Sequence, residues 1–276
     1  MTDTLEQVGM SRPERFFDAY LFDLDGTIYL GNDLLPGAQD LINELSARDA
    51  QTVFLSNNPT RDPDMYVDKL TKLGIPVRRE QIINTVVTTV LWLQRNHPDA
   101  VVFPIAEEPL INALMVAGIR MSDKPSEIDI VIASYDRHFT YAKLQTAFDA
   151  LWRREHVQLI TTNPDKYCPF PGGRGEPDAA AIVAAIEASS GAQCVANMGK
   201  PDRIMIDTVV AELGADPRLT IMVGDRLETD VRMAVNAGMQ SALVLTGDSQ
   251  LSDVAQLPAE LRPTFVVPGV GDLIPR

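Results

Sequence analysis

Two aspartates separated by one residue stand at the end of an apolar run near the N-terminus. Residues 20–27 read YLFDLDGT, which is typical of a short buried strand that ends where Gly26 turns the chain. Alternation along a strand places Asp23 and Asp25 on one face, and neighbouring carboxylates repel unless a cation lies between them. The pair suits a divalent metal with one aspartate as ligand, or a nucleophile beside an acid/base. A solvated turn uses the same residue types.

Three further stretches place polar residues where such chemistry needs them. Residues 53–58 (VFLSNN) and 220–225 (TIMVGD) are apolar runs with polar ends, and residues 198–201 (MGKP) hold one lysine between glycine and proline. Open α/β sheets bind ligands at the carboxyl ends of their strands, so these ends should meet at one edge. Taken singly, each polar residue also has an ordinary use as a helix cap or a surface group. The residues concerned are Ser56, Asn57, Asn58, Lys200, Asp225 and Asp230.

The ordered set DxDGT, SNN, GK and GDxxxxD resembles the haloacid dehalogenase (HAD) superfamily of aspartate-nucleophile phosphatases. The resemblance covers residues 18–270. It is strongest to the NagD-like, class IIA phosphatases, which include p-nitrophenyl, phosphoglycolate and pyridoxal phosphate phosphatases. Residues 224–230 (GDRLETD) and 162–165 (TNPD) both resemble that group.

This resemblance implies Mg²⁺-dependent hydrolysis of a phosphate monoester. Asp23 would attack phosphorus to form an aspartyl-phosphate, while Asp25 would protonate the leaving group and then activate water. Asp23, Asp225 and the backbone carbonyl of Asp25 would hold Mg²⁺, which prefers oxygen ligands. Asp230 would orient Lys200 or a metal-bound water, and Asn58 would support the site. The groups expected to bind phosphate are Asp25, Gly26, Ser56, Asn57 and Lys200.

Composition narrows the class of protein. The chain has 276 residues, of which 45% are hydrophobic, and a net charge of −14. A chain this acidic, without a basic cluster, is a poor partner for nucleic acid. No apolar run is long enough for a membrane span, and the polar N-terminus does not resemble a secretory signal. Cys168 and Cys194 have no metal-ligand spacing, so we expect reduced thiols in a cytoplasmic protein.

Strand and helix patterns alternate along the chain, which predicts an α/β protein with a doubly wound, parallel, Rossmann-like sheet. Asp23 and Ser56 are 33 residues apart, room for little more than one helix, whereas Ser56 and Lys200 are 144 apart. A second α/β domain must therefore lie between them, which the resemblance identifies as a C2-type cap. We predict a HAD core formed by 1–85 and 179–276, and a cap formed by 86–178.

Substrate choice should reside in the cap, where residues 162–178 form a long predicted loop rich in Pro and Gly. Its polar residues could reach the leaving group or simply be exposed. They are Asn163, Asp165, Lys166, Tyr167 and Arg174. The expected partner is a small phosphorylated metabolite: a sugar or polyol phosphate, glycerol phosphate, phosphoglycolate or pyridoxal phosphate. Relatives often pair through their caps, which implies a homodimer.

Two other functions use the same aspartyl-phosphate. A phosphotransferase would pass the phosphoryl group to an acceptor other than water. A non-enzymatic switch would keep Asp23 phosphorylated, although a cap inserted over the site and an acid/base at Asp25 argue against it. A dehalogenase would leave Asp25 without a purpose.

Overall fold

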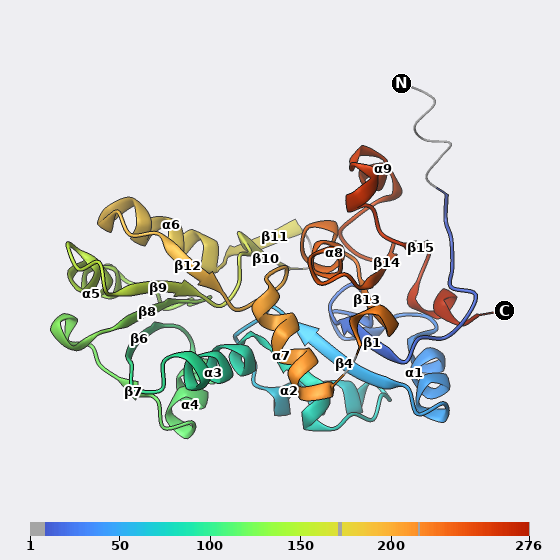
Figure 1. The fold of residues 1–276 in the computed structure, drawn as a ribbon, viewed down its shortest axis with the longest axis horizontal. Helices are drawn as coiled ribbons and strands as arrows, with labels where there is room; N and C mark the ends of the chain where they lie inside the picture. Colours follow the sequence, from blue (N-terminus) through green and yellow to red (C-terminus); the bar gives the residue numbers. More distant parts are fainter. Residues whose placement is uncertain (1–8, 171–172, 215, 276) are drawn as a thin grey trace. The chain divides into compact units, whose positions relative to one another are not determined.

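The computed structural model describes residues 9–170, 173–214 and 216–275. The chain divides into two compact units (Figure 1). Unit 1 comprises Met1–Leu55, Tyr66–Ile82 and Pro201–Arg276, and unit 2 comprises Ser56–Met65 and Ile83–Lys200. The chain therefore passes between the units four times. Among the described residues, no helix is both long and apolar enough to cross a membrane.

A six-stranded sheet organises unit 1, in the order β15-β14-β13-β1-β4-β5. Strand β1 at its centre is parallel to both neighbours, with Phe22 in register with Val223 of β13 and Phe54 of β4. The rings of Tyr20, Phe22 and Phe54 stack at 5.7 and 5.8 Å between centroids. The strands are β1 (Ala19–Asp23), β4 (Gln51–Ser56), β5 (Ile82–Asn84), β13 (Thr220–Gly224), β14 (Gln240–Val244) and β15 (Phe265–Val267).

Both faces of this sheet are buried, as expected for parallel strands joined by helices. The helices are α1 (Ala38–Ala47), α2 (Pro63–Lys72), α7 (Arg203–Leu213), α8 (Arg232–Ala237) and α9 (Leu251–Gln256). A hairpin of β2 (Tyr29–Leu30) and β3 (Asp33–Leu34) follows β1. A π-helical turn, Leu227–Val231, joins β13 to α8. Such turns often occur at functional sites.

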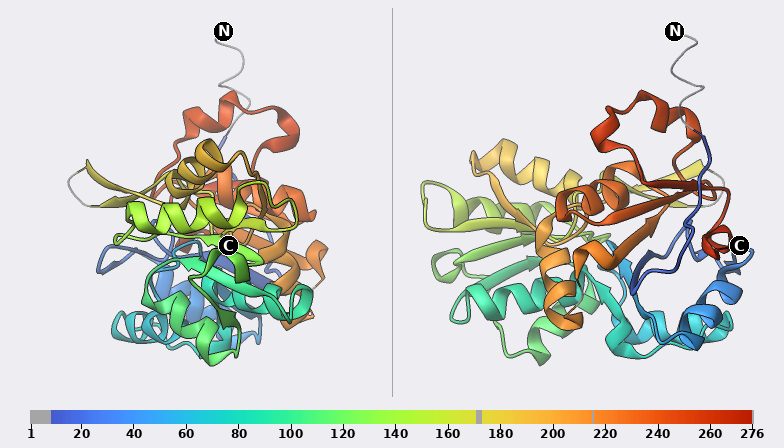
Figure 2. Two further views of the ribbon diagram at one scale, coloured as in Figure 1. Left: turned by 90° about the vertical axis from the view of Figure 1, so that its left-hand side faces the viewer. Right: turned by 45° about the vertical axis from the view of Figure 1, so that its right-hand side comes forward.

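Unit 2 has its own parallel sheet, in the order β12-β9-β8-β6-β7. Its strands are β6 (Val101–Ile105), β7 (Arg120–Met121), β8 (Ile130–Ala133), β9 (Gln158–Thr161) and β12 (Cys194–Asn197). Helix α5 (Tyr141–Leu151) packs on α6 (Ala179–Ser190), and α3 (Thr85–Asn96) packs on α4 (Glu108–Val116). The strands lie between these two helix pairs (Figure 2).

The end of unit 2 differs from the predicted boundary at residue 178. Helix α6 places Ile182 and Ile186 in the apolar core of unit 2, and β12 pairs in parallel with β9. The chain returns to unit 1 for its last segment only after Lys200. The sequence did not reveal β12 because that strand is four residues long and has no clear alternation. Without β12, nothing in the sequence connected α6 to the sheet of unit 2, so α6 was assigned to the core.

The predicted loop 162–178 also differs from the structure. Strands β10 (Tyr167–Phe170) and β11 (Arg174–Pro177) form an antiparallel hairpin there, in which Pro169 lies opposite Gly175. Proline lacks the N–H that a sheet needs and glycine disfavours extended structure, so the segment resembled a loop. The two residues at the tip of this predicted loop, 171–172, lie outside the described part of the chain.

Candidate active site

Three carboxylates of unit 1 meet at the carboxyl edge of its sheet. Asp23 is the last residue of β1, Asp225 directly follows β13, and Asp230 lies in the π-helical turn. One oxygen from each lies within 4.8 Å of the other two. Asp225 and Asp230 are only 3% and 1% exposed, so their charges have little solvent to screen them. The sequence predicted Asp23 and Asp225 as metal ligands and Asp230 as a supporting residue, and the structure groups all three.

Glycines let the backbone pack directly against these carboxylates. A Cβ atom on Gly26 would lie 2.6 Å from Asp225 Oδ2, and one on Gly247 would lie 1.9 Å from the same oxygen. A Cβ on Gly224 would lie 2.2 Å from the Asp230 carboxyl carbon. Larger residues at these positions would displace the acids, so the glycines fix where the carboxylates lie.

Backbone N–H groups donate hydrogen bonds to two of the acids. Asp248 N–H donates to Asp225 Oδ2 at 2.7 Å, and Arg226 N–H donates to Asp230 Oδ2 at 3.1 Å. Hydrogen bonds from N–H groups favour the carboxylate over the carboxyl form. Three carboxylate oxygens this close together, two of them from buried residues, fit a hard divalent cation such as Mg²⁺, which would offset the repulsion among them. The observed donors therefore suit the implied metal.

The loop after β14 was missed by the sequence analysis. Thr246 donates its hydroxyl to the Gly26 carbonyl at 2.6 Å, and Gly247 and Asp248 contact Asp225 as described. A sequence feature that could have identified this loop is the apolar strand β14 before it, whose carboxyl end lies at the same edge of the sheet.

Asp25 lies just beyond β1 and is exposed. Its Oδ2 accepts a hydrogen bond from the hydroxyl of Tyr29 at 3.2 Å. The neighbouring Gly26 adopts a φ of +86°, which side chains with a Cβ rarely adopt. The chain therefore turns at Gly26, as the sequence predicted, and Asp25 is exposed just beyond the strand.

The remaining core motifs lie in unit 2, where Asn57 connects them. Asn57 Nδ2 donates to Asp165 Oδ2 at 3.2 Å and to the Lys200 carbonyl at 3.1 Å, and Asn57 Oδ1 accepts from Lys200 N–H at 2.8 Å. Gly199 permits this approach, since a Cβ there would lie 2.7 Å from Asn57 Oδ1. Lys200 is 2% exposed. The segment after β4 is thus fastened to the segment that carries Lys200.

Ser56 and Asn58 shape the turn that follows β4. Ser56 is buried, and its Oγ accepts from Asn58 N–H at 3.2 Å. Asn58 Oδ1 in turn accepts from the N–H and the hydroxyl of Thr60 at 2.9 and 2.7 Å. Asn58 therefore stabilises the turn after β4.

The predicted specificity residues separate into two groups. Asn163 is fully buried, and its Nδ2 donates to the Asn57 carbonyl at 3.1 Å and to Asp178 Oδ1 at 3.3 Å. Together with Asp165, it connects loops of unit 2, whereas the sequence predicted that it would either reach the leaving group or be exposed. Lys166 precedes the β10–β11 hairpin, Tyr167 and Arg174 lie on it, and all three are exposed. Arg174 pairs with Glu176 at 2.5 Å.

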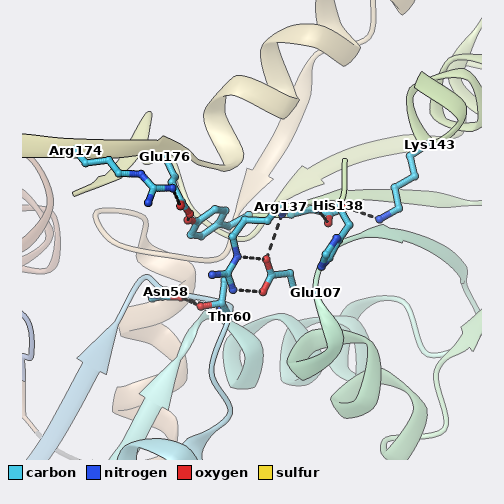
Figure 3. Close-up of polar contacts among 10 residues, drawn as sticks. Asn58, Thr60, Glu107, Arg137, His138, Lys143, Arg174 and Glu176 are labelled. Carbon is cyan, nitrogen blue, oxygen red and sulfur yellow. Dashed lines mark hydrogen bonds and ion pairs between the residues drawn. The ribbon is translucent and has the colours of Figure 1, made fainter. Parts of the chain in front are cut away.

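A second polar network follows the ends of β6 and β8 in unit 2 (Figure 3). Arg137 donates from Nε and Nη2 to the two oxygens of Glu107, each at 2.6 Å, which holds the pKa of Glu107 below its usual range. The Tyr135 hydroxyl donates to Glu176, and burial, followed by this bond, raises the pKa of Tyr135. The sequence analysis did not single out these residues, although Glu107, Tyr135 and Arg137 follow strand ends.

Gly247→Ala tests the glycine packing around Asp225. The added methyl group would displace the Asp225 carboxylate, so we expect Mg²⁺ affinity to fall at least about tenfold in isothermal titration calorimetry. Gly269→Ala is the control, because its Cβ would lie 3.7 Å from the nearest atom, Thr246 Cγ2, at a φ of −157°. Equal Mg²⁺ affinities in both variants would contradict the assigned cation site.

Glu107→Gln tests the ion pair with Arg137. A carboxyl group whose pKa is lowered by folding contributes stability above its unfolded pKa of about 4.3 and loses that contribution as pH falls through the folded value. We expect Glu107→Gln to be less stable than wild type by about 1 kcal/mol at pH 7 and by less at pH 3, measured by urea unfolding. Glu155→Gln, an exposed glutamate of the same unit, is the control. A difference that does not depend on pH would argue against the pair.

Two family models match the chain. A model of haloacid dehalogenase-like hydrolases matches residues 20–120, and a second model of HAD-like hydrolases matches residues 197–273. The matches include the first motif, with Asp23 and Asp25, the second motif at Ser56, and the last two motifs.

Named relatives and a solved structure agree with these matches. Human chronophin is 34% identical over 270 residues, covering 92% of this chain and 90% of its own. The acid sugar phosphatase of Staphylococcus aureus (strain USA300) is 32% identical, covering 86% and 90%. The crystal structure of 4-nitrophenylphosphatase from Thermotoga maritima superimposes with a TM-score of 0.87 at 32% identity, covering 93% and 96%. The chain therefore belongs to the haloacid dehalogenase-like hydrolases and, within them, to the NagD-like, class IIA phosphatases.

Proposed function

We propose that this phosphatase hydrolyses small phosphorylated metabolites through an aspartyl-phosphate on Asp23, with Mg²⁺ as its cofactor. The observation that carries the proposal is the cluster of Asp23, Asp225 and Asp230 at the end of β1. These are the residues that would hold the cation. Bound Mg²⁺ would neutralise the cluster and the approaching phosphate, so that an anionic nucleophile could meet an anionic substrate.

Asp23 and Asp25 would divide the chemistry between them. Asp23 lies at the end of a rigid central strand, and its carboxylate would form the bond to phosphorus. Asp25 is exposed, so it can exchange protons with the leaving group and with water. Breaking the aspartyl-phosphate with water would restore Asp23 and release inorganic phosphate.

Ser56, Asn57 and Lys200 would bind the phosphate oxygens, Ser56 by its hydroxyl and Asn57 by its backbone N–H. Chain connectivity supports this assignment. Ser56 directly follows Leu55, the register partner of Asp23, and Lys200 directly precedes the last segment of unit 1. Lys200 would neutralise charge that moves during transfer, which a protein with a net charge of −14 needs locally.

The leaving group would contact unit 2, and a sugar or polyol phosphate fits the proposal best. One relative is named for acid sugar phosphates, and the exposed Lys166, Tyr167 and Arg174 near and on the β10–β11 hairpin would offer hydrogen bonds to hydroxyl groups. A homodimer formed through unit 2 and a cytoplasmic location stay predictions.

Phosphate release from a panel of monoesters tests the function. The panel contains 4-nitrophenyl phosphate, a sugar phosphate, glycerol phosphate, phosphoglycolate and pyridoxal phosphate, each with Mg²⁺ or with chelator. We expect release that requires Mg²⁺ and that falls at least about 1,000-fold in Asp23→Asn, as for other lost nucleophiles. Asp33→Asn, at an exposed aspartate of β3, is the matched control. Release that survives both the chelator and the Asp23 substitution would refute the proposal.

A further inference from the structure

The turn after β1 is closed by backbone hydrogen bonds. The Leu24 carbonyl accepts from the N–H groups of Thr27, Ile28 and Tyr29 at 3.3, 2.9 and 3.2 Å, and Gly26 N–H donates to the Tyr29 carbonyl at 2.8 Å. Asp25 and Tyr29 also form an isolated bridge. Because both ends of the turn are bonded, the backbone of Tyr29 has a fixed position relative to that of Asp25.

The side chain of Tyr29 returns to Asp25. Its ring is fully buried, and its hydroxyl donates to Asp25 Oδ2 at 3.2 Å. Among residues 9–170, 173–214 and 216–275, this hydroxyl is the one hydrogen-bond donor to the Asp25 carboxylate. An exposed aspartate samples several rotamers, so a bond from a rigid, buried ring is what selects its orientation.

A cation lies over the same ring. Lys69, in the last turn of α2, places its Nζ 3.4 Å from the centroid of the Tyr29 ring. A positive charge over the face of a phenol ring draws electron density from the hydroxyl oxygen into the ring. The O–H bond becomes more polarised, so the hydroxyl is a stronger hydrogen-bond donor. Lys69, Tyr29 and Asp25 therefore form a chain of contacts that ends at the proposed acid/base.

We propose that Tyr29 is a positioning residue for proton transfer by Asp25, and that Lys69 strengthens its hold. The inference rests on the proposed function. As an Asp23 oxygen bonds to phosphorus, the bond from phosphorus to the leaving oxygen breaks and its electron pair stays on that oxygen. The Asp25 carboxyl group then gives its proton to the leaving oxygen. Because Tyr29 donates to Oδ2, the transferable proton lies on Oδ1.

Esters differ in how much they need this proton. An alkoxide is a strong base and leaves slowly unless it is protonated, whereas 4-nitrophenolate is a weak base and leaves as an anion. Loss of Asp25 positioning should therefore slow alkyl phosphates more than 4-nitrophenyl phosphate. The value of kcat/KM is the right measure, since it covers the steps up to departure of the leaving group and excludes hydrolysis of the aspartyl-phosphate, which both esters share.

The test compares Tyr29→Phe with wild type on glycerol phosphate and 4-nitrophenyl phosphate. The substitution removes one hydroxyl and keeps the buried ring. We expect kcat/KM for glycerol phosphate to fall about tenfold more than kcat/KM for 4-nitrophenyl phosphate, the effect of one hydrogen bond. Tyr20→Phe is the matched control, because it removes another buried hydroxyl, which accepts from Phe17 N–H at 3.2 Å. It should leave the ratio of the two values unchanged.

A second pair of variants separates positioning from packing. Lys69→Met should lower kcat/KM for glycerol phosphate about two- to fivefold more than kcat/KM for 4-nitrophenyl phosphate. Lys69→Arg keeps a cation over the ring, so its ratio of the two kcat/KM values should match that of wild type. If Tyr29→Phe does not fold, these Lys69 variants still test whether Tyr29 positions Asp25. Equal loss on both esters, or no loss, would overturn the positioning role while leaving the phosphatase intact. If wild type hydrolyses neither ester, the proposed function itself fails.

Discussion

Repulsion among three carboxylates is the constraint on which this site depends. Asp23, Asp225 and Asp230 place oxygens within 4.8 Å of one another in a largely buried setting. Backbone N–H groups donate to Asp225 and Asp230, and the backbone at Gly26, Gly224 and Gly247 packs directly against these two acids. Repulsion among carboxylates held this close together favours the binding of a divalent cation. In the proposed function, a cation bound there would allow this edge of an acidic protein to accept phosphate.

Within each unit, the fold brings residues that are distant in sequence close together. Parallel pairing puts the ends of β1 and β13 side by side, although 200 residues of chain separate Asp25 from Asp225. In unit 2, the side chain of Asn57 binds both backbone groups of Lys200, so one amide fastens two motifs 143 residues apart. Each unit therefore positions its own part of the chemistry by short polar contacts at strand ends.

The fold class and most of the candidate site could be predicted from the sequence, because polar residues directly after apolar strands form short, recognisable motifs. Asp23, Asp25, Ser56, Lys200 and Asp225 all follow or lie within recognisable motifs, and the strand and helix alternation fixed the fold class. The failures have physical causes. Strand β12 was too short to show a pattern, and the prolines of the β10–β11 hairpin disguised it as a loop. The contacts of Gly247 and the complete burial of Asn163 are long-range features that no local pattern encodes.

Trapping the covalent intermediate is the most direct test of whether Asp23 forms an aspartyl-phosphate. Wild-type protein turning over a good substrate with Mg²⁺ would be quenched and reduced with borohydride, which converts an aspartyl-phosphate to homoserine, and then mapped by mass spectrometry. We expect homoserine at position 23, dependent on substrate and on Mg²⁺. Modification at another residue, or efficient turnover with position 23 unmodified, would contradict it.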